Sequence, residues 1–101
     1  MSERRIVRVT DAFFVQLDEQ LGRDRGDEGR PSATDFLVYE LPAAVDLFAT
    51  DFESLPEVVD GFSAGRVVIT AGSLVRAFAV YGLLLADGSI NIIGVEIDLG
   101  D

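Results

Sequence analysis

Hydrophobic residues recur at two different spacings along the chain, and the spacing changes near residue 66. Residues 4–9 alternate between charged and apolar side chains, which predicts a short, half-solvated strand. In residues 11–21, and again after a capping box at residues 32–35, the apolar positions follow helical spacing. Because Pro42 interrupts the second stretch, we expect a kink or two consecutive helices that meet there.

From Arg66 onward the apolar positions follow a period of two, which predicts three strands joined by tight turns at Ala71-Gly72 and Asp87-Gly88. The expected fold is α+β in the order β-α-α-β-β-β, with two or three helices packed on one face of a four-stranded, mainly antiparallel sheet. A chain of 101 residues is too short to divide, so we expect a single domain over 1–101. Residues 22–31 contain glycines and charges but nothing to bury, which predicts a mobile loop.

Counting back from two-residue turns assigns each strand residue to a face of the sheet. The face under the helices is expected to hold Val67, Ile69, Leu74, Arg76, Phe78, Val80, Ile93, Val95 and Ile97. The opposite face carries the one cluster with chemical content, a candidate partner-binding site: Arg66, Ala77, Ala79, Tyr81, Gly94, Glu96 and Asp98.

Small residues form the floor of this cluster and leave room for a bound molecule. In a functional interpretation Arg66 clamps an anion, Tyr81 stacks or transfers a proton, and the two carboxylates hold a cation or act as acid and base. In the simpler interpretation Arg66 pairs with Asp98 across the strands and Tyr81 is merely exposed. We assign no catalytic residue, metal ligand or cofactor.

Composition excludes several chemistries. The chain has no Cys and no His, so it lacks a thiolate nucleophile, a zinc-finger pattern and the commonest acid/base residue. Its net charge is -10, and residues 31–101 hold two Arg against eleven acids, which disfavours binding to nucleic acid or anionic membranes. It has neither an apolar run long enough to span a bilayer nor a signal-peptide core, so we expect a cytoplasmic protein without membrane contact.

The element order and three strand motifs resemble the RelE/ParE toxin superfamily over essentially the whole chain. The motifs are "RVVI" at residue 66, "VRAFAVYG" at residue 75 and "DGSINIIGVEID" at residue 87. The resemblance implies a toxin of a toxin–antitoxin module that cuts messenger RNA or poisons gyrase, and that an antitoxin peptide wraps. By position, Arg66 and Tyr81 match residues common in that family. Glu96, Asp98 and Asp101 stand where ribonuclease members end in basic or aromatic residues, so the implied activity is non-nucleolytic.

We therefore expect a toxin-type domain that acts through protein binding, with an antitoxin peptide or a second copy as its partner. Two alternatives stay open. One is an acidic interaction or inhibitor module without toxin activity, and the other is a ribonuclease whose chemistry has moved to the Arg-rich N-terminal segment.

Overall fold

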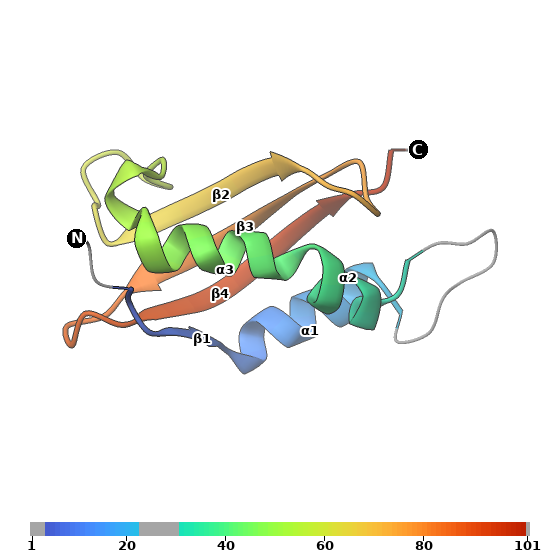
Figure 1. Cartoon of the computed structure of the whole chain (residues 1–101), viewed down its shortest axis with the longest axis horizontal. Helices are drawn as coiled ribbons and strands as arrows, with labels where there is room; N and C mark the ends of the chain where they lie inside the picture. The colour runs from blue at the N-terminus through green and yellow to red at the C-terminus, as the bar shows by residue number, and fades with distance from the viewer. Residues whose placement is uncertain (1–3, 23–30, 101) are drawn as a thin grey trace.

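The computed structural model describes residues 4–22 and 31–100 (Figure 1). Its elements follow in this order: β1 (Val7–Val9), α1 (Asp11–Gln20), α2 (Ala33–Tyr39), α3 (Leu41–Thr50), the 3-10 helix η2 (Phe52–Ser54), β2 (Gly65–Ala71), β3 (Ala77–Leu84) and β4 (Ile90–Asp98). The strands form one sheet in the order β1-β4-β3-β2, in which β1 is parallel to β4 and the other neighbours are antiparallel. The expected α+β fold is confirmed, with a mixed sheet. Most of the loop predicted at 22–31 lies outside the described residues.

Helices α2 and α3 meet where the sequence predicted a break. The capping box forms, because Ser32 Oγ accepts the Asp35 N–H at 3.1 Å and the Asp35 carboxylate accepts the Ser32 N–H at 2.9 Å. Helix α2 ends at Tyr39, and α3 begins at Leu41 with Pro42 in its first turn. Proline fits there because first-turn amides have no partner within the helix.

The helices cover one face of the sheet, with α1 running beside β4 (Figure 1). The core between helices and sheet includes these buried side chains: Phe13, Leu17, Phe36, Phe48, Phe52, Val68, Val80, Ile92 and Val95. Within residues 4–22 and 31–100, no helix is long and apolar enough to cross a membrane.

Two glutamines of α1 close the edge of β4 beyond the end of β1. Gln16 bonds the Ile93 carbonyl and the Val95 amide, both at 3.1 Å. Gln20, one turn later, bonds the Val95 carbonyl and the Ile97 amide, both at 2.7 Å. The two side-chain amides therefore replace the backbone of a neighbouring strand and protect this sheet edge.

The β3–β4 hairpin has the predicted register in the half farther from its turn. Val80 lies opposite Val95, and Ala79 lies opposite Glu96. Side chains of the two strands therefore alternate between the helix side and the outer side as expected. The register shifts between Tyr81 and the next residue of β3, so the half nearer the turn differs.

The predicted two-residue turn at Asp87-Gly88 is wrong by one residue. Leu85 N–H donates to the Ser89 carbonyl at 2.8 Å, which leaves three residues in the loop, and Gly88 has a φ of 88°. Such a loop commonly ends on a left-handed glycine. Between the turn and the register shift, Ile93 is an extra residue without a partner in β3, and this bulge restores the predicted register. Ile93, expected in the core, is consequently 39% exposed.

The predicted turn at Ala71-Gly72 is also wrong, and this error moves the whole of β2. Ala71 pairs with Ala77, so the loop has five residues, 72–76. The register differs from the predicted one by an odd number of residues, which transfers every β2 side chain to the opposite face. The corrected assignments are that Arg66 and Val68 face the helices, Val67 and Ile69 face the outer side, and Leu74 and Arg76 lie in the loop.

Buried Glu40, between α2 and α3, holds this longer loop. Its carboxylate accepts the N–H groups of Ser73 at 2.9 Å, Leu74 at 3.0 Å and Val75 at 3.3 Å. A β-carbon on Gly72 would collide with Glu40 Oε2, so the position requires glycine. The contact joins residues 33 to 35 positions apart, which is why local turn rules did not predict it.

Candidate interaction face

The outer face of the sheet, defined as the side away from the helices, brings together six of the seven predicted site residues. The strand pairs place Ala77 opposite Asp98, Ala79 opposite Glu96, and Tyr81 opposite Gly94. Ala77, Ala79 and Tyr81 alternate with buried residues along β3, and the residues that lie opposite them in β4 share their face, although Gly94 is itself buried. Arg66 is the exception.

Arg66 lies on the helix side of β2, so its predicted place in the cluster is wrong. Its guanidinium donates to three backbone carbonyls: Ser63 at 2.8 Å, Leu55 at 2.8 Å and Glu53 at 3.0 Å. The guanidinium carbon lies 5.4 Å from the centre of the Phe52 ring. Arg66 Nη2 also forms an ion pair with Glu57 Oε2 at 3.8 Å. Arg66 therefore fixes the chain after α3, and the expected pair with Asp98 does not form.

One end of the outer face is acidic. A shallow hollow of about 220 Å³ lies there, lined by Ile69, Ala77, Phe78, Ala79, Glu96, Ile97 and Asp98. Arg76 approaches Asp98 at 3.9 Å, and the side chains of both residues are largely exposed. An exposed pair at this distance contributes little to stability, so the hollow remains a surface on which carboxylates are accessible.

Tyr81 connects the acidic end with the rest of the face. Its hydroxyl donates to Glu96 Oε1 at 2.9 Å. Burial, and then this hydrogen bond, raise the pKa of Tyr81 above its ordinary value. A tyrosine of this kind stays protonated at neutral pH, so the pair suits binding better than proton abstraction. In the described part of the chain, no group of three acidic side chains could hold a metal ion.

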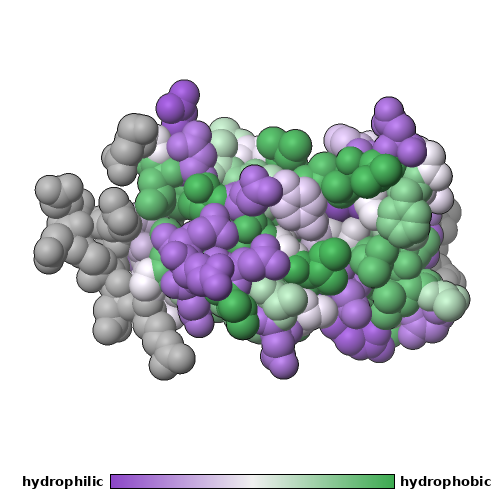
Figure 2. Space-filling view, turned by 180° about the vertical axis from the view of Figure 1, so that it is seen from behind, coloured by the Kyte–Doolittle hydropathy of each residue, from purple (hydrophilic) through white to green (hydrophobic). Residues whose placement is uncertain are grey.

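The other end of the outer face is apolar. Figure 2, which views the molecule from behind, shows hydrophobic residues gathered over one half and hydrophilic residues over part of the other. A groove of about 360 Å³ lies here, lined by Gln16, Val58, Val59, Phe62, Gly65, Tyr81, Gly82, Leu83, Ile93 and Gly94. Val59 is 60% and Phe62 51% exposed. Exposed apolar side chains beside a groove are typical of interaction sites.

The segment before β2 forms one wall of this groove, which the sequence did not predict. Val58 N–H donates to the Gly65 carbonyl at 3.0 Å, so the segment runs beside β2. A β-carbon on Gly65 would lie 3.1 Å from the Phe62 ring, so glycine lets the ring lie close to the strand. The available signal was the cluster of large apolar residues in "PEVVDGF", where no helix or strand period explains them.

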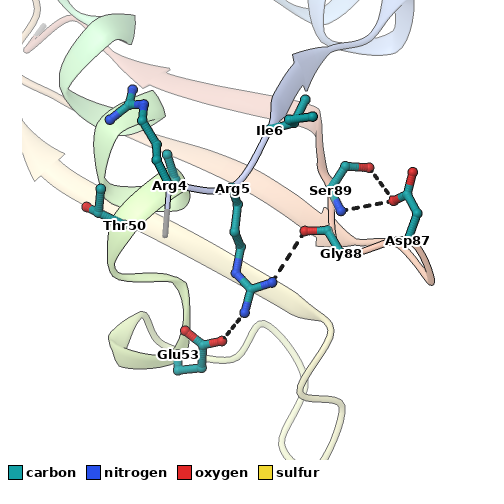
Figure 3. A pocket seen from close by; sticks show the side chains of 9 residues that line it. Arg4, Arg5, Ile6, Thr50, Glu53, Asp87, Gly88 and Ser89 are labelled. Atoms are coloured by element: carbon teal, nitrogen blue, oxygen red, sulfur yellow. Dashed lines mark hydrogen bonds and ion pairs between the residues drawn. The ribbon is translucent and has the colours of Figure 1, made fainter. Parts of the chain in front are cut away.

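A third depression, of about 590 Å³, lies beside the N-terminal strand (Figure 3). Arg5 points into it and donates to the Glu53 carboxylate and, at 3.3 Å, to the Gly88 carbonyl. On its far wall the Ser89 hydroxyl and N–H donate to Asp87, which lowers the pKa of that carboxyl. Each charged side chain that lines the depression already has a bonded partner: Arg5 has Glu53, Arg4 has Asp46, and Asp87 has Ser89. The depression is therefore a weaker candidate for binding an ion.

The sequence matches no protein-family model, and no curated protein or solved structure matches the chain.

Proposed function

We propose that the protein is a non-catalytic protein-binding domain, and that its outer sheet face is the interface. The observation that carries the proposal is the apolar groove of Val58, Val59, Phe62, Leu83 and Ile93, which lies uncovered on the sheet face opposite the helices. The partner that fits is a protein that inserts an apolar side chain into the groove and presents basic residues to the acidic end.

The groove is large enough to supply a central binding contact. Full burial of one Leu, Ile or Phe side chain contributes about 1.5–3 kcal/mol. A residue of that kind is the usual core of an interface, where a few buried anchors carry most of the binding energy. Exposed Phe62 and Ile93 would be buried by the same event, which adds to the stabilisation.

Charge selects the class of partner. The chain has a net charge of -10, and Glu96 and Asp98 stand on the face itself. The outer face therefore repels nucleic acid and attracts a basic protein surface. The arginine that a ribonuclease would need at this face is bound to backbone carbonyls elsewhere, so we do not place RNA cleavage on this face. The ribonuclease alternative concerns the Arg-rich N-terminal segment, part of which lies outside the described residues, and it stays a separate hypothesis.

A narrower form of the proposal is that the chain is a RelE/ParE-like, non-nucleolytic toxin-type domain whose partner is an antitoxin peptide. The order β-α-α-α-β-β-β and the helix-covered sheet favour it. An acidic inhibitor module without toxin activity would use the same face. The two differ in what expression does: a toxin-type domain slows growth of its host unless the partner is present, and an inhibitor does not.

In the first step of the test, a photo-crosslinking amino acid replaces residue 93, which lies in the groove. In a separate control protein, it replaces residue 38. Val38, like Ile93, is an exposed β-branched apolar residue, but it lies on helix α2. The protein crosslinked from residue 93 is then purified, and its affinity is measured by calorimetry for the wild type and for Ile93→Asp, Ala79→Arg and Val38→Asp.

We expect Ile93→Asp and Ala79→Arg to weaken binding at least tenfold, roughly 1.4 kcal/mol, and Val38→Asp to leave it unchanged. Each variant is first checked for a wild-type circular dichroism spectrum. Equal affinities for the wild type and Ile93→Asp would refute the proposed interface, as would a loss confined to Val38→Asp.

A further inference from the structure

We infer that the free edge of β2 binds an extended, basic segment of a partner protein, which adds a strand to the sheet. The inference rests on the proposed function for the existence of a protein partner, but it concerns a different surface.

The hydrogen-bond phase of β2 determines which backbone groups point outward. Leu84 N–H donates to the Ala64 carbonyl at 2.8 Å, and the pairing continues in register, so even-numbered residues of β2 bond β3. Odd-numbered residues therefore direct their N–H and carbonyl groups to the other edge. Val58 N–H meets the Gly65 carbonyl on that edge, which confirms the phase.

A proline ends the coverage of this edge. Val67 N–H donates to the Pro56 carbonyl at 3.1 Å, but Pro56 has no N–H to return a bond to Val67. The residues before Pro56 form the 3-10 helix η2 and do not run beside β2. Among the described residues, the one hydrogen bond to an outward group of β2 beyond Val67 comes from the Thr70 hydroxyl, 3.3 Å from the Ala71 carbonyl. Ile69 and Ala71 thus present two N–H donors and two carbonyl acceptors along this edge, and of these four groups the Ala71 carbonyl alone already accepts a hydrogen bond within the described residues.

The other edges of the sheet are protected. The strand at the opposite edge of the sheet, β1, has three residues. Arg8 lies within it, and Arg5 precedes it. Short, charged edge strands resist pairing. Beyond β1, the edge of β4 is closed by Gln16 and Gln20. The edge of β2 at Ile69 and Ala71 therefore differs from the opposite edge, because it has neither a charged side chain within it nor, in the described part of the chain, a segment that covers it.

The free edge of β2 at Ile69 and Ala71 favours a basic strand. Ile69 is 70% exposed and lines the same hollow as Glu96 and Asp98. A strand added at this edge lies three strand spacings, roughly 14 Å, from β4. Arg or Lys side chains on its outer face are attracted toward Glu96 and Asp98 across Ile69 and Ala79 without reaching ion-pair distance. A second copy of this chain would bring acid against acid, because each copy has a net charge of -10.

The experiment uses two blocked synthetic peptides, one of alternating Arg and Val and a control of alternating Glu and Val. The chain is followed by amide hydrogen exchange and by NMR chemical shifts. We expect the Arg–Val peptide to slow exchange of the Ile69 and Ala71 amides at least tenfold, and the Glu–Val peptide to have no effect. The variant Ala71→Pro, which removes one outward donor, should weaken peptide binding roughly tenfold.

Several results would overturn the inference. Shifts confined to Phe62 and Ile93 would mean that the peptide binds the groove, so the edge would be excluded while the proposed function stands. Failure of the Arg–Val peptide to bind, or equal binding of both peptides, would exclude a basic strand. Protection of Ile69 that appears without peptide and grows with protein concentration would identify a second copy as the occupant. If Ala71→Pro does not fold, exchange in the wild type decides.

Discussion

Removing the Glu40 side chain should destabilise the protein through a loop far away in the sequence. The carboxylate accepts three N–H groups, from Ser73, Leu74 and Val75, at 2.9, 3.0 and 3.3 Å. In Glu40→Ala these donors lose their acceptor. Water can reach Ser73 and Leu74, which are exposed, but Val75 is only 5% exposed.

The magnitude follows from these exposures. A buried donor left without a partner costs about 1–3 kcal/mol, and a net hydrogen bond that water can partly replace contributes about 0.5–1.5 kcal/mol. One buried and two accessible donors together give about 2–6 kcal/mol, and from the lower half of that range we expect a loss of about 3 kcal/mol in the free energy of unfolding. For a domain of this size, that loss corresponds to a decrease in Tm of roughly 12–24 °C.

The assay is urea unfolding followed by circular dichroism, with calorimetry for Tm. Glu40→Gln keeps the size of the side chain but turns an NH₂ group toward backbone donors, so we expect it to be destabilised as well. Glu19→Ala, at an exposed position on α1, should change stability by less than about 0.5 kcal/mol. A loss below about 1 kcal/mol for Glu40→Ala, or wild-type stability of Glu40→Gln, would refute the proposed role of the carboxylate.

Three further predictions concern other contacts. Gly82→Ala should destabilise the fold by about 1–3 kcal/mol in urea unfolding, because its β-carbon would lie 2.5 Å from the Phe48 ring; wild-type stability would contradict this packing. Gln20→Leu should increase amide exchange along β4 at least tenfold, because two hydrogen bonds of 2.7 Å are lost; unchanged exchange would mean that α1 does not protect the edge. In a Tyr39→Phe background, ultraviolet titration should place the pKa of Tyr81 above 10, and Glu96→Gln should lower it only in part, since burial is the larger cause. Because folding raises this pKa, the Tyr81 contribution to stability is present below pH 10 and is lost as the pH rises through the folded-state pKa; a pKa at or below 10 would contradict it.

The sequence by itself determined the elements whose causes are local. Ser32 and Asp35 satisfy each other within one turn, so the start of α2 could be predicted from four residues. Pro42 breaks the helical run wherever the rest of the chain lies. The period-two pattern of β3 and β4 fixed the faces of Val80 and Val95, because alternation is a property of the strand.

The tertiary structure decided the positions that depend on contacts between distant segments. Glu40 sets the loop between β2 and β3, and the odd change in register moves Arg66 from the outer face to the helix side. The groove exists because Phe62 lies close to a strand that has glycine at residue 65. Because side chains alternate, an error of one residue in the predicted loop length assigns every residue of the strand to the wrong face. The length of this loop depends on the Glu40 carboxylate, which lies about 33 residues away in the chain.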